Sequence, residues 1–132
     1  MLRLTVLSML WLPTLALAAS GGWSASGTGA ALSQRGVQAS SPALSPPAPV
    51  AGMMTAVYWQ YQLTGPTPAG MQVRLCSASR CAAIEGSSGS TRGLSNVAAN
   101  ESLRFVFYVE GKGRLFPVLR VLSNQVMVNY QQ

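Results

Sequence analysis

The chain has 132 residues, of which 48% are hydrophobic and only 9% are charged, a globular composition with room for one domain around one core. Nine Lys and Arg residues oppose three acidic residues, all of them Glu, and there is no His, so the formal net charge is +6. Without His and Asp, the chain cannot build Ser-His-Asp or Cys-His catalysis, a His-containing zinc site or Asp-based phosphoryl transfer. We therefore expect no enzyme, no metal site and no cofactor.

Residues 1–18 have the pattern of a secretory signal peptide. Arg3 supplies the positive charge, Leu4 to Leu12 form a short apolar run, and Ala16-Leu17-Ala18 offers the small residues that signal peptidase requires. The run is shorter than the roughly 20 residues that a bilayer-spanning helix needs, and no later segment is long and apolar enough. We expect cleavage after Ala18 and an exported chain without stable membrane insertion.

The predicted mature chain keeps a net charge of about +5, because only Arg3 is lost from the +6 of the precursor. Nucleic acid is the usual partner of such a basic excess, but export argues against it. Anionic surfaces outside the cytoplasm fit better, whereas a contribution to solubility alone is an equally good explanation.

Residues 19–52 form a Gly/Ser/Pro-rich N-terminal segment. Short strands are predicted near Trp23 to Ser26 and near Ala31 to Val37. The prolines between Ser40 and Pro49 exclude a regular helix and predict an extended loop with freedom to move. Residues 53–132 carry the core of the fold, and 19–132 together are predicted to form one domain.

Strand signals dominate after residue 52. Met54 to Leu63 is rich in aromatic and β-branched residues that alternate, and a turn at Gly65 to Gly70 leads into a second strand, Met71 to Leu75. A short return strand is predicted from Cys81 to Glu85, followed by a polar loop from Gly86 to Gly93. Tyr58, Trp59 and Tyr61 could form a sugar-stacking platform, but core packing is the better interpretation of these aromatics.

The last third of the chain predicts a β-hairpin. Leu103, Phe105, Phe107 and Val109 alternate up to the loop Gly111-Lys112-Gly113, and a three-residue loop would pair Val109 with Leu115 and Phe105 with Leu119. Pro117 predicts an edge strand or a bulge, because it has no N–H to donate. Ser123-Asn124-Gln125 is expected to turn the chain into a final strand, Val126 to Tyr130. The fold class is therefore all-β, a small antiparallel β-sandwich or barrel-like single domain.

Cys76 and Cys81 are the only cysteines, and an even, minimal count in an exported chain predicts one structural disulfide. The bridge would clip a strand–loop–strand corner as a hairpin disulfide. The alternative, a redox switch, is disfavoured because the spacing is not Cys-x-x-Cys and no helix N-terminus follows to lower a thiol pKa.

Other catalytic arrangements have little support. Glu85 and Glu101 could supply the two carboxylates of a glycosidase, but they sit beside a Ser/Gly loop and at a strand entry. A Ser–Lys dyad would have to use Lys112, whose place in a turn between glycines is unsuited to desolvating a base.

The second face of the predicted hairpin is a candidate partner-binding surface. Its candidate binding residues are Arg104, Tyr108, Phe116 and Arg120, and Val106 and Val118 lie on the same face. Mixed arginine and aromatic groups are common in protein interfaces. The hairpin register would place Arg104 opposite Arg120, where an acidic group of a partner could bridge them. The alternative is that the Pro-rich segment or another sheet covers this face.

Two long motifs point to a family. They are Gly65-Pro66-Thr67-Pro68-x-Gly70 followed by Val73-Arg74-Leu75-Cys76-Ser77-x-Ser79-Arg80-Cys81, and the C-terminal run Gly113-Arg114-Leu115-x-Pro117-x-Leu119-x-Val121-x-Ser123-Asn124-x-Val126-x-Val128-Asn129-Tyr130. In combination they resemble the FlhE family of flagellar proteins, and the resemblance extends from about Trp23 to Tyr130.

The resemblance implies a non-enzymatic periplasmic accessory protein of the bacterial flagellum. Such a protein would regulate flagellar type III export by limiting proton leakage through the export apparatus, or would act as a periplasmic chaperone for flagellar subunits. Its partners would be the export apparatus or the exported subunits, and Cys76 and Cys81 would form its disulfide. The alternative from the residues alone is a periplasmic module that binds carbohydrate or cell wall, which exposed and aligned aromatics would favour.

Overall fold

The computed structural model describes residues 20–132, so the predicted signal peptide, residues 1–18, lies outside the described residues. These residues form nine β-strands and no helix. The strands are β1 (Ser20–Gly27), β2 (Ala31–Gln34), β3 (Ala39–Ser40), β4 (Met53–Leu63), β5 (Met71–Cys76), β6 (Cys81–Ile84), β7 (Ser88–Thr91), β8 (Arg104–Val109) and β9 (Arg114–Gln131). Within this part of the chain there is accordingly no helix that could cross a membrane.

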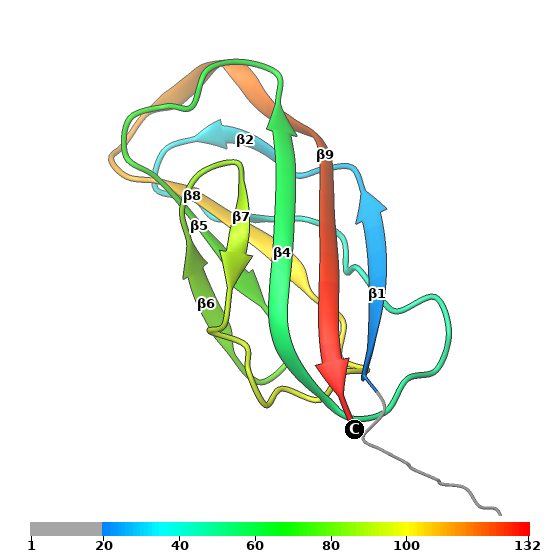
Figure 1. The fold of residues 1–132 in the computed structure, drawn as a ribbon. Coiled ribbons are helices and arrows are strands. Elements are labelled where there is room, and N and C mark those ends of the chain that lie inside the picture. Colours follow the sequence, from blue (N-terminus) through cyan, green and yellow to red (C-terminus); the bar gives the residue numbers. More distant parts are fainter. Residues whose placement is uncertain (1–19) are drawn as a thin grey trace, which may run out of the picture.

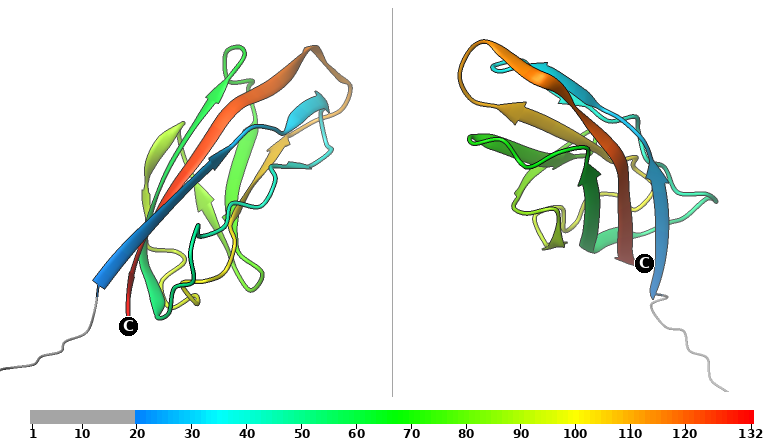
Figure 2. Two further views of the ribbon diagram at one scale, coloured as in Figure 1. Left: turned by 90° about the vertical axis from the view of Figure 1, so that its right-hand side faces the viewer. Right: turned by 90° about the horizontal axis from the view of Figure 1, so that it is seen from above.

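Two antiparallel sheets pack face to face (Figures 1 and 2). The front sheet has the strand order β1-β9-β4-β7, with β2 paired to another part of β9. The back sheet has the order β3-β8-β5-β6. The predicted fold class, a small antiparallel all-β sandwich, is confirmed.

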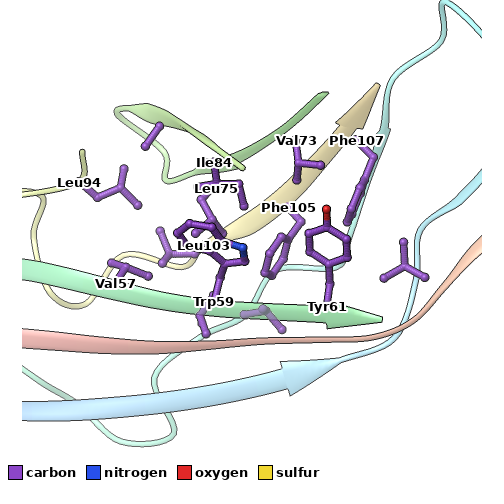
Figure 3. Packing of buried hydrophobic residues seen from close by; sticks show 14 of the residues in the cluster. Val57, Trp59, Tyr61, Val73, Leu75, Ile84, Leu94, Leu103, Phe105 and Phe107 are labelled. Atoms are coloured by element: carbon purple, nitrogen blue, oxygen red, sulfur yellow. The ribbon is translucent and has the colours of Figure 1, made fainter. Parts of the chain in front are cut away.

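The core lies between the sheets and is built from alternate residues of their strands. Tyr61 of β4 meets Phe107 of β8 edge to face, with ring centroids 5.3 Å apart, and Phe105 stacks beside Phe107 at 6.0 Å (Figure 3). Burial raises the pKa of the Tyr61 hydroxyl, because an ionised phenolate would be desolvated there. Trp59 is also buried and donates its indole N–H to the carbonyl of Gly86. The aromatic residues of β4 that face inward are therefore core residues, as predicted.

The predicted hairpin between residues 103–109 and 114–121 is wrong. Strand β8 pairs with β3 and β5, whereas β9 pairs with β1, β2 and β4, so the two strands belong to opposite sheets. The large apolar residues that the prediction turns inward are all buried, although Pro117 of the same parity is exposed, and those of β8 and β9 face one another across the core. These buried residues are Leu103, Phe105, Phe107, Val109, Leu115, Leu119 and Val121. Alternation shows which side of a strand is buried, and it cannot distinguish a partner in the same sheet from one across the sandwich.

The predicted turn at Ser123-Asn124-Gln125 is also wrong, because β9 runs unbroken through it. The register with β4 shifts between Gln62↔Ser123 and Leu63↔Val121, which leaves Leu122 as an extra residue. Such a β-bulge changes which residues point inward. Val121 and Asn124 are both buried although they are three residues apart, so the alternation of buried and exposed residues shifts by one position at the bulge. In the sequence this shift resembles the end of one strand and the start of another.

The N-terminal segment contributes strands to both sheets. Trp23 and Leu32 lie in the core, and the Pro-rich loop (residues 41–52) is anchored to β8 through Ser41, whose N–H donates to the carbonyl of Phe105, and to the residue just before β8. There the buried Leu44 exchanges backbone hydrogen bonds with Leu103, at 2.7 and 2.9 Å between N and O. The prediction of an extended loop holds, but freedom to move does not fit these contacts.

Two further strands were not predicted. β3 is only a two-residue bridge to β8. β7 lies inside the predicted polar loop and pairs with β4, from Val57↔Thr91 to Gln60↔Ser88. Its Ser-Gly-Ser-Thr sequence has no apolar alternation, so the usual signal for a strand is missing.

The predicted disulfide is confirmed. Cys76 and Cys81 are directly paired residues of β5 and β6, with Cα atoms 4.0 Å apart and a sulfur–sulfur bond between them. The loop that they close is tied down further, because the carboxylate of Glu101 accepts hydrogen bonds from the N–H of Ala78 and the hydroxyl of Ser79. The cysteines thus clip a strand–loop–strand corner, as the structural interpretation requires.

Candidate partner-binding site

A hollow of about 510 Å³ lies between the β4–β5 loop and the first part of β9. Its lining combines apolar residues with arginines: Arg35, Thr64, Gly65, Pro66, Pro68, Arg114, Leu115, Phe116, Pro117, Val118, Leu119 and Arg120. We call it the arginine hollow. Phe116 is 87% exposed, more than any other large hydrophobic side chain in residues 20–132. A phenyl ring left in solvent beside arginines is typical of a surface that binds another molecule.

The hollow exists because β9 is irregular where it faces β2. Leu32 pairs with Leu119, and the next pair is Gln34 with Arg114, so β2 advances by two residues while β9 advances by five. Pro117 lies in this surplus and has no N–H for the ladder. Leu115 and Leu119 turn into the core, and Phe116 between them points outward. The prediction that Pro117 marks an edge or a bulge is confirmed.

Arg35 joins the three connections around the hollow. Its guanidinium donates hydrogen bonds to the carbonyls of Ala69 and Glu110, each at 3.1 Å, and its backbone N–H donates to Gly113 at 2.8 Å. It therefore holds the β2–β3, β4–β5 and β8–β9 connections together. The β4–β5 loop is fixed at its start as well, because the hydroxyl of Thr64 accepts a hydrogen bond from the N–H of Arg120 at 3.0 Å.

Of the three arginines of the hollow, Arg114 and Arg120 are the ones whose guanidinium groups are available to a partner. Both are exposed, and within residues 20–132 their guanidinium groups make no hydrogen bond, in contrast to that of Arg35. Each therefore has its planar set of donors available for a carboxylate.

The structure divides the four predicted binding residues between the two sheets. Phe116 and Arg120 line the arginine hollow, whereas Arg104 and Tyr108 belong to β8 in the back sheet and pair with Cys76 and Gln72. The prediction that Arg104 lies opposite Arg120 is wrong, because it depended on the β8–β9 hairpin.

Sequence reasoning did not find Arg35, Arg114, Pro66 and Pro68 as members of one site. The two motifs that carry the family resemblance do contain most of the residues that line the hollow. Their segments Gly65–Pro68 and Gly113–Leu119 are remote in sequence and meet around the hollow. Nothing in the sequence alone indicates that meeting.

The other candidate chemistries are not assembled in the described residues. Glu85 lines a second hollow of about 560 Å³, which Glu101 does not line. No group of three or more His, Cys, Asp or Glu residues in this part of the chain could hold a metal ion. Trp59 and Tyr61 are buried while Tyr58 is 48% exposed, so the three do not form a sugar-stacking platform.

The fold and the hollow together define a small disulfide-bonded β-sandwich domain whose distinctive surface is an exposed aromatic residue among arginines. Comparison with known proteins places this domain in a family. The family model described as Flagellar protein FlhE matches residues 29–131. The chain therefore belongs to the FlhE family of flagellar proteins.

Individual relatives agree with this assignment. The chain is 55% identical over 126 residues to Flagellar protein FlhE of Salmonella typhimurium, covering 95% of this chain and 97% of that protein. Identity to Flagellar protein FlhE of Escherichia coli K12 is 52% over 128 residues, covering 96% and 98%. A crystal structure of FlhE superposes with a TM-score of 0.85 at 56% identity, covering 87% of this chain and 100% of that one.

Proposed function

We propose that this chain is a non-enzymatic periplasmic accessory protein of the bacterial flagellum, and that it acts by holding a protein segment in the arginine hollow. Membership of the FlhE family supports the flagellar role. The single observation that carries the binding site is Phe116, 87% exposed between Arg114 and Arg120. A flagellar subunit in transit through the periplasm is the partner we favour, which makes the protein a chaperone.

The composition of the hollow defines the segment that it would hold. Prolines and Phe116 offer apolar surface, and the arginines offer donors for carboxylates. A matching segment has an apolar side chain next to Asp, Glu or a chain terminus. Such a segment would be exposed on a subunit that has been exported but not yet assembled. The hollow would cover it until assembly and so prevent misplaced contacts.

Binding at the export apparatus, with control of proton leakage, would use the same surface on a resident partner. The two roles differ in what is bound: a subunit that passes through, or a component that stays. In-cell photocrosslinking from position 116 separates them, since the captured proteins can be identified by mass spectrometry. Exported subunits would support the chaperone role, whereas components of the apparatus would support the control of leakage.

The energetic test replaces Phe116 by Ala. Burying a Phe side chain contributes about 1.5–3 kcal/mol, so the variant should bind its partner roughly ten- to hundredfold more weakly. The fold should be unaffected, because Phe116 is 87% exposed in the free protein. Tyr58→Ala is the matched control, an aromatic that is 48% exposed on β4 and does not line the hollow. Equal effects of the two variants, or crosslinks to wall fragments alone, would refute the proposal.

A further inference from the structure

The outer edge of β1 is a long, regular sheet edge. β1 pairs with β9 without a bulge, from Ser20↔Gln131 to Gly27↔Asn124, and it is the last strand on its side of the front sheet. In an antiparallel ladder, alternate residues direct their N–H and C=O groups to the two sides, so about half of β1 presents such groups away from β9. Within residues 20–132, no backbone hydrogen bond outside the β1–β9 ladder involves β1.

Three features of the strand itself by which proteins usually protect a sheet edge are absent from β1. Those features are very short strands, Lys or Pro on the edge, and bulges. The sequence of β1 is SGGWSASG, with eight residues and no charge or proline. By contrast, β6 and β7 at other sheet edges have four residues each, and β3 has two. The edge of β1 is therefore the one that offers an extended ladder to another chain.

The surroundings of this edge indicate what could pair with it. β1, β4, β7 and residues 121–131 of β9 contain no charged residue, although the chain carries a net charge of +6. The outward side chains of β1 are only Ser and Gly. An uncharged segment can lie there without opposing or burying a charge, and the small side chains leave room for larger ones beside them.

Either a second copy of this protein or a single extended segment could pair with the edge of β1, and the position of the Pro-rich loop favours the single segment. Figure 1 and the right-hand view of Figure 2 both show this loop projecting beyond β1. Two copies paired antiparallel through β1 would be related by a two-fold axis, so each would direct its own loop at the other. A single extended segment carries no such loop.

We propose that the outer edge of β1 binds an uncharged extended segment of a partner polypeptide by strand addition. The backbone ladder supplies the affinity, so the mode tolerates different sequences as long as the segment is extended and uncharged. No residue of β1 lines the arginine hollow, so this is a second binding surface that does not depend on the hollow.

The probe is a synthetic peptide with the sequence of residues 124–131, NQVMVNYQ. It is uncharged, and the same segment of β9 already pairs with β1 on its inner side. Nuclear magnetic resonance of the protein purified after export should show saturable shifts of the amides of residues 20–27. Alternate amides of β1 that exchange rapidly with solvent in the free protein should become protected. The control peptide has identical side chains and N-methylated amides, and it should produce neither effect.

Three results of this peptide experiment would overturn the proposal: no saturable shift with the unmodified peptide, equal binding of the N-methylated peptide, or shifts that map away from β1. Sedimentation of the protein alone provides a separate test of the occupant. The protein should remain monomeric as its concentration rises. A dimer whose formation protects the β1 amides would identify a second copy as the occupant and contradict the assignment.

Discussion

Replacing Gly36 by Ala should disturb the framework of the arginine hollow. Gly36 has a φ of +83°, and an added Cβ would lie 2.8 Å from the carbonyl oxygen of Gly111, which is backbone and cannot swing aside. The N–H of Gly36 also donates to Val109 at 2.7 Å, next to the contacts of Arg35. The substitution therefore has two unfavourable effects. Alanine is strained at this positive φ, and its methyl group would collide with the backbone of the β8–β9 connection at Gly111.

Gly113→Ala is the matched control, because its φ of +102° is also in the left-handed region but an added Cβ has no atom within 4 Å. Holding an alanine at a positive φ alone lowers the free energy of unfolding by about 1–2 kcal/mol. Displacing the Gly36 backbone should also break one or two hydrogen bonds, at about 0.5–1.5 kcal/mol each. We expect Gly36→Ala to lower the free energy of unfolding by about 3 kcal/mol and Gly113→Ala by about 1 kcal/mol.

Urea unfolding, monitored by tryptophan fluorescence, measures both variants. For a domain of this size, about 3 kcal/mol corresponds to a fall in Tm of roughly 10 °C or more. Partner binding at the hollow should weaken in the folded Gly36→Ala protein and stay unchanged in Gly113→Ala. If the two variants are equally stable, the close approach of Gly36 to Gly111 is not a feature of the folded protein, and the account of how the hollow is held together fails.

Three further predictions concern the disulfide, the buried tyrosine and the arginines. Replacing Cys76 and Cys81 together by Ala should lower the free energy of unfolding by about 2 kcal/mol in urea titration, since the ring is short, and should leave partner affinity unchanged; a change in affinity with redox state would revive the redox switch. Burial raises the pKa of Tyr61, so the unfolded chain loses this proton at lower pH than the folded chain, and the contribution of Tyr61 to stability should be constant below about pH 10 and fall as the pH rises above it. Tyr61→Phe should remove that part of the alkaline loss, and an identical pH profile in both proteins would contradict the assignment. Arg120→Glu should weaken partner binding while Arg104→Glu does not, because the two lie in opposite sheets; equal loss in a direct binding assay would restore the shared patch.

The sequence predicts the burial pattern of this fold better than its pairing. The alternation of Phe105 and Phe107 in one strand and of Val126 and Val128 in another identifies inward faces correctly, because each strand has one face on the core. Strand partners depend on which edges are already occupied. β8 lies between β3 and β5, so the short loop after it leads across the sandwich instead of into a hairpin.

The candidate site was less accessible to prediction for the same reason. Phe116 and Arg120 belong to one strand and were identified together, but Arg35 reaches the hollow only because β2 pairs with β9 and turns beside the β8–β9 connection. Three connections from distant parts of the sequence make the site. A local pattern carries no information about loops that meet only after both sheets have formed.

The arginine hollow carries charge and the β1 edge does not, so binding at these two proposed surfaces should respond differently to salt. A basic excess that served solubility alone needs no particular location, yet β1, β4, β7 and residues 121–131 of β9 carry no charge, whereas Arg35, Arg114 and Arg120 gather at the hollow. Exposed charges are screened over about 10 Å at 0.1 M ionic strength. Raising the salt concentration should therefore weaken and slow binding at the hollow, mainly through the association rate, and leave peptide addition to β1 unchanged or slightly stronger. A hollow that binds its partner equally well at low and high salt would show that Phe116 and the prolines act without the arginines.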